Sequence, residues 1–245
     1  MILDVDVGNS RIKWRLSENN SPVASGSQAT SEVAAGEPLA VAESVAVKQV
    51  RIACVAASEV LEVLCRQLNR QFAVVPKVAQ VTESVASVVC AYEDPRSFGV
   101  DRWLALVAAY QQFNQALLVV DAGSAITMDL LSPEGLHLGG FIIPGLSLMC
   151  DSLRRDTSGV KVVCGETQGL LLPAKDTQQA VSRGCVLATV AVIEKLAGQY
   201  PVRILLTGGD AEVLVEALSL KSDHCPDLVL DGLSVDAISF VDGPL

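Results

Sequence analysis

Apolar and polar positions at the N-terminus predict a β-hairpin. Residues 2–7 form an apolar run that is broken only by aspartates. Residues 11–16 alternate basic and apolar side chains, with the period of two expected for a half-buried strand. Gly8, Asn9 and Ser10 lie between the two segments and have the chemistry of a turn. We therefore expect two antiparallel strands joined at residues 8–10.

The rest of the chain alternates strand-like and helix-like segments. Strands are predicted near Val23 and at 50–56, 72–75, 117–120 and 202–206. Helices are predicted at 34–47, 59–70, 100–113 and 177–197, the third of these from a clear apolar stripe. This alternation is typical of an α/β layer.

The opening segment is repeated about half a chain length later. Residues 2–10 and 117–125 both read as an apolar strand, then Asp-x-Gly with a small polar residue, then a second strand. An internal repeat of this length indicates duplicated lobes. We expect lobes at 1–114 and 115–245, with Asp6 and Asp121 on opposite sides of one cleft.

The charge balance limits the classes of partner. The formal net charge is −10, so nucleic acid and anionic membranes, which need a basic surface, are not expected partners. ATP remains possible, because backbone amides, helix N-termini and a divalent cation can hold its phosphates. The apolar runs are shorter than the roughly 20 residues of a membrane helix, and the N-terminus lacks the basic region of a secretory signal.

The cysteines point to a reducing compartment. Their number is odd, their spacing is wide and they form no Cys-x-x-Cys pair. We therefore expect free thiols and a cytoplasmic location. The seven are Cys54, Cys65, Cys90, Cys150, Cys164, Cys185 and Cys225.

The two Asp-x-Gly turns have the groups that phosphate binding requires. Glycine lets backbone N–H groups approach phosphate oxygens, and a carboxylate at a strand end can hold Mg²⁺. Asn9, Ser10 and Ser124 offer neutral donors, and Lys13 follows the first turn. A single Asp-x-Gly is usually no more than a strand ending in a turn. The repetition in the same strand context favours the functional interpretation.

Two further glycine clusters are candidate sites at which a ligand can lie close to the backbone. Gly208 and Gly209 lie between a predicted strand and a predicted helix, where a glycine pair lets a flat ring or a phosphate lie against the backbone. Gly139 and Gly140 precede another predicted helix, and a tight bend between packed elements explains them equally well.

The segment Phe98–Trp103 contains the most specific chemistry. Asp101 and Arg102 start a predicted helix directly after Gly99. In the functional interpretation, Asp101 accepts the proton of a substrate alcohol and Arg102 binds a substrate anion such as a carboxylate. The alternative is a helix cap with a surface ion pair.

Four segments together resemble a known family. They are Asp6–Lys13, Gly99–Arg102, Asp121–Thr127 and Gly139–Gly145. In order and spacing they resemble the type III pantothenate kinases, also known as the Bvg accessory factor family. The resemblance implies an α/β, actin-like ATPase (ribonuclease H-like) fold with two duplicated lobes of mixed sheet flanked by helices. It also implies phosphorylation of pantothenate by ATP, the first step of coenzyme A synthesis, and a homodimer with shared active sites.

The resemblance also implies roles for individual residues. ATP and its Mg²⁺ would be held by Asp6, Gly8, Asn9, Ser10 and Lys13, with ATP contacts from Ser124, Gly208 and Gly209. Pantothenate would be held by Tyr92, Gly99, Val100, Asp101 and Arg102, with Asp101 as proton acceptor, and by Thr177 of the other subunit. Asp121 would bind a monovalent cation, K⁺ or NH₄⁺.

Two other functions are compatible with parts of this pattern. Another actin-fold phosphotransferase or a phosphatase would share the hairpin motifs but would not be expected to have Gly99–Arg102. A catalytically silent regulatory homologue would share the fold, but Asp6, Asp101 and Asp121 are all present.

Overall fold

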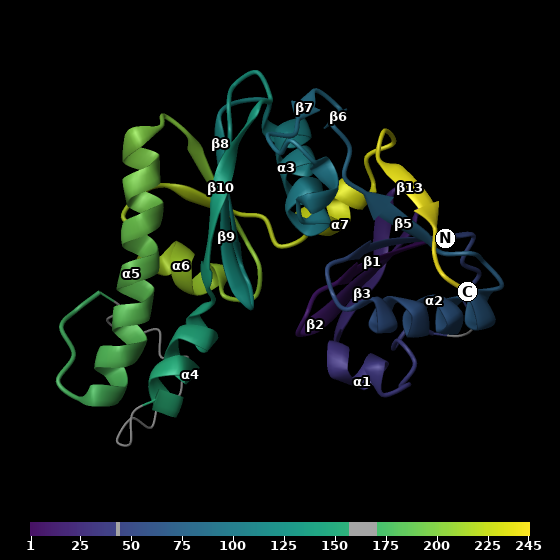
Figure 1. The fold of residues 1–245 in the computed structure, drawn as a ribbon, viewed down its shortest axis with the longest axis horizontal. Coiled ribbons are helices and arrows are strands. Elements are labelled where there is room, and N and C mark those ends of the chain that lie inside the picture. The colour runs from purple at the N-terminus through teal and green to yellow at the C-terminus, as the bar shows by residue number, and fades with distance from the viewer. Residues whose placement is uncertain (43–44, 157–170) are drawn as a thin grey trace. The chain divides into compact units, whose positions relative to one another are not determined.

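The computed structural model describes residues 1–42, 45–156 and 171–245. The chain forms two compact units (Figure 1). The first contains residues 1–111 together with 228–245, and the second contains residues 112–227. Within the described residues, no helix is both long and apolar enough to cross a bilayer.

The first unit is built on a six-stranded sheet with the order β13-β5-β4-β1-β2-β3. Its strands are β1 (Ile2–Val7), β2 (Arg11–Glu18), β3 (Ser21–Ala29), β4 (Gln49–Cys54), β5 (Lys77–Gln80) and β13 (Ser239–Asp242), with a small separate pair, β6 (Ser84–Val85) and β7 (Val88–Val89). Its helices are α1 (Thr30–Ala34), α2 (Ser58–Phe72), the 3₁₀ turn η1 (Pro95–Ser97), α3 (Val100–Phe113), whose last two residues lie in the second unit, and α7 (Leu228–Leu233).

One face of this sheet is apolar and is covered by α1 and α2. Alternate residues of β1 (Leu3, Val5, Val7) are fully buried and pack with Val33 of α1 and Leu64 of α2. Figure 1 shows α1 and α2 on the lower side of the sheet and α7 on its upper side. The period-2 pattern of β1 thus directs its apolar side chains toward the two helices.

The opposite face carries a buried charge network that anchors the C-terminal segment. Asp4, whose side chain is fully buried, accepts hydrogen bonds from Arg51 Nε at 2.6 Å and Nη2 at 3.0 Å. Arg15 Nη1 donates to Asp231 of α7 at 2.6 Å, and Ser234 Oγ lies 3.4 Å from Asp4 Oδ2. Helix α7 packs against β1 and β4 through these contacts.

The second unit is built on a five-stranded sheet with the order β10-β9-β8-β11-β12. Its strands are β8 (Leu117–Ala122), β9 (Ala125–Leu131), β10 (His137–Pro144), β11 (Arg203–Thr207) and β12 (Ser222–His224). Its helices are α4 (Leu146–Asp156), α5 (Thr177–Gln199) and α6 (Ala211–Ala217).

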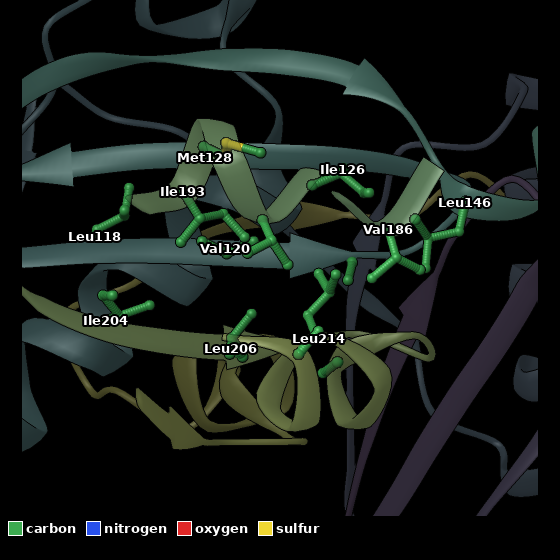
Figure 2. Close-up of a cluster of buried hydrophobic side chains, with 14 of the residues drawn as sticks. Leu118, Val120, Ile126, Met128, Leu146, Val186, Ile193, Ile204, Leu206 and Leu214 are labelled. Atoms are coloured by element: carbon green, nitrogen blue, oxygen red, sulfur yellow. The ribbon is translucent and has the colours of Figure 1, made fainter. Parts of the chain in front are cut away.

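The core of the second unit lies between this sheet and its helices. Figure 2 shows Leu118 and Val120 of β8, Ile126 of β9, Ile193 of α5 and Leu214 of α6 in one apolar cluster. All five side chains are fully buried. This core fixes β8 and β9, the two strands that carry the second Asp-x-Gly turn.

The two sheets repeat the same strand order. In the first unit, β3-β2-β1 is antiparallel and β1-β4-β5 is parallel. In the second, β10-β9-β8 is antiparallel and β8-β11-β12 is parallel. The predicted duplication is thus visible in topology as well as in sequence, and the first unit adds β13 at its edge.

The structure differs from the sequence expectations at three places. The helix predicted at 34–47 is wrong, since α1 ends at Ala34, and the strand predicted at 72–75 is wrong, since α2 continues to Phe72 and ends at Ala73 in the left-handed conformation. Residues 228–245, which the sequence analysis assigned to the second lobe, belong to the first unit because β13 pairs with β5 and α7 packs on β1.

The expectation of free thiols is met at most of the cysteines. It is confirmed for Cys54, Cys65, Cys90, Cys185 and Cys225. It is wrong for Cys150, which is disulfide-bonded, because a disulfide requires two thiols to be close in space and the spacing of cysteines in the sequence does not reveal this. Cys164 lies outside the described residues.

Candidate functional site

The predicted turn at residues 8–10 joins β1 and β2. Gly8 N donates to Arg11 O at 3.0 Å, which closes the hairpin. Asn9 and Ser10 are exposed at its tip. A methyl group added at Gly8 would lie 3.0 Å from Arg11 O, so glycine suits the close turn. Donors at an exposed tip are accessible to a phosphate.

Asp6 lies at the end of β1, directly before this turn. It is paired across the hairpin with Lys13 of β2, which puts a carboxylate and an ammonium on neighbouring strands. It also lies near Cys54 at the end of β4. Burial raises the pKa of the Cys54 thiol, a hydrogen bond with the Ala56 backbone lowers it, and the Asp6 carboxylate raises it further. The turn, Asp6 and Lys13 therefore form one polar cluster at the ends of β1 and β4.

Thr30 belongs to this cluster, although the sequence analysis did not identify it. Its hydroxyl donates to Gly8 O at 2.8 Å, and its N–H donates to Ser10 O at 3.1 Å. The side chain is almost fully buried. No motif in the sequence marks a threonine that follows β3 as a support for this turn.

Asp101 is held at the start of α3 in close contact with the backbone. Its Oδ1 accepts a hydrogen bond from Arg102 N at 2.7 Å, within the first turn of the helix. A methyl group added at Gly99 would lie 2.7 Å from the same Oδ1. Gly99 is therefore needed for this position of the carboxylate, whichever role Asp101 has.

Arg102 is buried among aromatic side chains. Its guanidinium carbon lies 4.6 Å from the centre of the Phe98 ring, and Nη1 lies 3.5 Å from the Tyr92 hydroxyl. The Tyr92 and Phe98 rings are 4.8 Å apart. The structure thus brings the predicted Tyr92, Asp101 and Arg102 together. Phe98 was quoted in the motif but not selected as a site residue, since an aromatic side chain before a helix reads as core.

Asp121 occupies the same position in the second unit as Asp6 does in the first. It is paired with Thr127 across the β8–β9 hairpin and with Thr207 on β11. Gly123 N closes the turn by donating to Ala125 O at 3.0 Å. Gly208 has a φ of +94°, and a methyl group there would lie 2.5 Å from Asp121 Oδ1. The two predicted motifs of this unit therefore meet, with Gly208 lying directly against Asp121.

Gly145 supports the same turn from the end of β10. Its N–H donates to Ser124 O at 3.1 Å, and a methyl group there would lie 2.2 Å from Gly123 O. Ser124 itself is exposed. The predicted cluster at Gly139 and Gly140 proves to be part of strand β10, where the pairing with β9 is irregular after His137.

Asp210 follows the glycine pair at the start of α6. Its N–H donates to Ala122 O at 2.9 Å, and burial raises the pKa of its carboxyl. This contact ties the loop at Gly208 and Gly209 to the end of β8. Asp210 is not among the residues predicted from the sequence.

Thr177 is at the first position of α5. Asp176 caps this helix by accepting from Gln179 N at 2.9 Å. Thr177 lines a pocket of about 880 Å³ between α4 and α5, together with Lys175, Leu148 and Val181. This pocket combines an apolar wall with a polar rim.

Solved structures resemble the whole chain in fold. A conserved Baf family protein from Campylobacter jejuni is 22% identical with a TM-score of 0.62, and the match covers 95% of both chains. The ethanolamine utilization protein EutJ from Carboxydothermus hydrogenoformans is 15% identical with a TM-score of 0.51, over 95% of this chain and 88% of that one. With the repeated sheets, these likenesses confirm the predicted α/β, actin-like ATPase fold.

Sequence comparisons identify the family. The profile described as Type III pantothenate kinase matches residues 2–199. A protein named Type III pantothenate kinase from Pseudomonas aeruginosa (strain LESB58) is 36% identical, over 96% of this chain and 98% of its own length. One of the same name from Chromohalobacter salexigens is 39% identical, over 95% of this chain and 86% of its own length. The chain therefore belongs to the type III pantothenate kinase family.

Proposed function

We propose that this protein transfers the γ-phosphate of ATP to pantothenate, giving 4′-phosphopantothenate and ADP. The observation that carries the proposal is the match over nearly the whole chain to relatives named Type III pantothenate kinase. The polar clusters support it, since each unit has an Asp-containing turn and the first also has Asp101 beside Arg102. The reaction is the first step of coenzyme A synthesis, and we propose the cytoplasm as its location.

ATP and Mg²⁺ fit the first-unit turn chemically. Mg²⁺ is usually bound through one or two carboxylates together with substrate phosphates, and Asp6 supplies one carboxylate at a strand end. Lys13 adds a positive charge across the hairpin, and Gly8, Asn9 and Ser10 add backbone and side-chain donors. We assign these residues to the phosphates and the divalent ion.

In the second unit we assign Ser124, Gly208 and Gly209 to ATP and Asp121 to a monovalent cation, K⁺ or NH₄⁺. The support is a carboxylate oxygen that lies against the Gly208 backbone, at the end of β8. Oxygen atoms are the ligands that hard cations prefer. Asp6 and Asp121 occupy equivalent positions in the two units. Replacing each aspartate separately tests which of the two ions it binds.

We assign pantothenate to Tyr92, Gly99, Val100, Asp101 and Arg102. The guanidinium carbon of Arg102 lies 4.6 Å from the centre of the Phe98 ring, and a guanidinium can bind a carboxylate in a two-point contact. Asp101 would take the proton of the substrate hydroxyl while that oxygen bonds to the γ-phosphorus. The bond from phosphorus to the bridging oxygen breaks, and ADP leaves.

We further propose a homodimer in which Thr177 serves the pantothenate site of the partner. The support is helix α5, which is apolar on two faces. One face is buried in the core, and the other is exposed and mostly small or apolar: Gly184, Leu187, Ala188, Ala191, Val192, Lys195 and Gly198. A helix that is apolar all round is normally buried, so a second copy of this chain would cover the exposed face. Phe141 and Ile142 on edge strand β10 are also more than half exposed.

An ADP-release assay with and without pantothenate tests the main proposal. We expect release that depends on pantothenate, Mg²⁺ and a monovalent cation. Release with another alcohol substrate but not with pantothenate would indicate a different phosphotransferase. The absence of release with any substrate would favour a silent homologue.

Mixing two inactive variants tests the shared site. Asp101→Asn and Thr177→Arg homodimers would each have two broken sites, whereas a mixed dimer would have one intact site. With random pairing about half of the dimers are mixed, so activity should recover to roughly a quarter of wild type. Gln178→Arg, which adds the same charge at the neighbouring exposed position, should remain active by itself. No recovery from two folded, exchanging variants would rule out the shared site.

A further inference from the structure

Thr30 contacts both ends of the phosphate-binding turn. It is the first residue of α1, and its side chain is 4% exposed. Its hydroxyl donates to Gly8 O at 2.8 Å, and its backbone N–H donates to Ser10 O at 3.1 Å. One buried residue thus holds the carbonyl groups on either side of Asn9.

These contacts determine the direction in which the backbone N–H of Asn9 points. In a trans peptide, the C=O and the N–H leave the peptide plane on opposite edges. Since Gly8 O is bonded to Thr30, the N–H of Asn9 leaves the same peptide on the side away from Thr30. Gly8 N is already bonded to Arg11 O, and within the described parts of the chain no acceptor is found for Asn9 N. Asn9 is exposed, so its N–H is available to a ligand.

The hydroxyl is not needed to attach α1 to the sheet. Val33 of α1 is fully buried in the first-unit core, and Ala29 N donates to Glu32 Oε2 at 3.3 Å at the start of the helix. The Thr30 backbone N–H would also survive a change of side chain. What the hydroxyl adds is control of the Gly8–Asn9 peptide.

We propose that Thr30 is a positioning residue that aims the Asn9 N–H at a phosphate oxygen of ATP. This proposal rests on the proposed role of the turn in ATP binding. Thr30 acts through Gly8 and does not itself touch the nucleotide. Its loss should therefore affect the use of ATP and leave the use of pantothenate almost unchanged.

Thr30→Val tests the proposal with little change in shape. It replaces the donor with a methyl group, which leaves Gly8 O without this bond and lets the peptide rotate. Thr30→Ser keeps the hydroxyl. Thr189→Val is the matched control, since Thr189 is fully buried and its hydroxyl donates to Cys185 O at 3.0 Å within α5. The control loses the same kind of bond in the other unit.

We expect kcat/KM for ATP to fall about tenfold in Thr30→Val, because a hydrogen bond to a charged oxygen is weakened. The KM for pantothenate should stay within about twofold of wild type. Thr30→Ser should stay close to wild type for both substrates. Thr189→Val should lose a similar amount of thermal stability without any change in kcat/KM for ATP.

A binding measurement separates this proposal from the proposed activity. Calorimetric titration of each variant with a non-hydrolysable ATP analogue and Mg²⁺ needs no pantothenate. If the wild type bound the analogue tightly and Thr30→Val bound it weakly, the positioning role would hold even for a different phosphate acceptor. Equal affinity of the two proteins, with only a loss of stability, would overturn it.

A measurement on the wild type covers the case in which Thr30→Val does not fold. In a ¹⁵N-labelled sample, the Asn9 amide proton should shift downfield on addition of the same analogue with Mg²⁺. An unchanged Asn9 resonance at saturation would overturn the proposal.

Discussion

Replacing Asp4 with alanine should destabilise the first unit. The Asp4 side chain is fully buried, and its carboxylate binds Arg51 through two hydrogen bonds of 2.6 and 3.0 Å. Arg15 Nη2 lies 3.9 Å from the same carboxylate. Asp4→Ala would leave one poorly solvated arginine without its main partner.

The loss of unfolding free energy depends on the partners that the two arginines keep in Asp4→Ala. Removal of one partner from a buried ion pair typically costs about 3–5 kcal/mol. Here Arg51 keeps Ser234 Oγ at 3.1 Å, and Arg15 keeps Asp231 at 2.6 Å. We therefore expect the lower end, about 3 kcal/mol, out of a total of about 5–15 kcal/mol. For a chain of this length, that corresponds to a fall in Tm of about 6–12 °C.

Urea unfolding and differential scanning calorimetry measure this loss. The control is Asp242→Ala in the same unit, because Asp242 pairs with Lys77 while its side chain is 68% exposed. Loss of such a surface pair should cost no more than about 1 kcal/mol. In a double-mutant cycle, Asp4→Ala with Arg51→Ala should cost less than the sum of the single changes. An Asp4→Ala variant as stable as Asp242→Ala would refute the reasoning.

Three other predictions concern the proposed site. Asp101→Asn should keep ATP binding but fall below about a tenth of wild-type turnover, and higher turnover would make Asp101 a capping residue. Asp6→Ala should impair Mg²⁺-dependent nucleotide use, whereas Asp121→Ala should blunt activation by K⁺ or NH₄⁺; a cation titration that left the Asp121→Ala response intact would contradict the assignment. Gly145→Ala should weaken ATP binding measured by calorimetry, because the new methyl group would lie 2.2 Å from the carbonyl oxygen of the turn. Gly198→Ala, which meets nothing within 4 Å, should bind ATP as wild type does.

The local parts of the fold could be predicted from the sequence. The hairpins around Asp6 and Asp121 are indicated by alternating apolar positions and by glycine in the turns, and these signals lie within a few residues. Helix α3 has the predicted bounds, Val100–Phe113, because its apolar stripe is continuous. Asp101 and Arg102 could be identified because they start this helix directly after a glycine.

The non-local contacts could not be predicted. Thr30 supports a turn that it meets only after β3 has folded back along β2, and nothing near Thr30 in sequence marks this. Arg102 lies against Phe98 and Tyr92 through the path of a loop that lacks a readable pattern. The assignment of residues 228–245 failed for the same reason, since the pairing of β13 with β5 joins distant parts of the chain.

The return of residues 228–245 to the first unit affects the order of folding during synthesis. The second unit, residues 112–227, is continuous in sequence, so all of it is translated before α7 and β13 appear. Domains tend to fold as they emerge from the ribosome. The first unit must wait with β5 lacking its β13 neighbour and with Arg15 lacking Asp231. The unit whose translation begins first is thus the last to have its full sequence, because residues 228–245 follow the whole of the second unit.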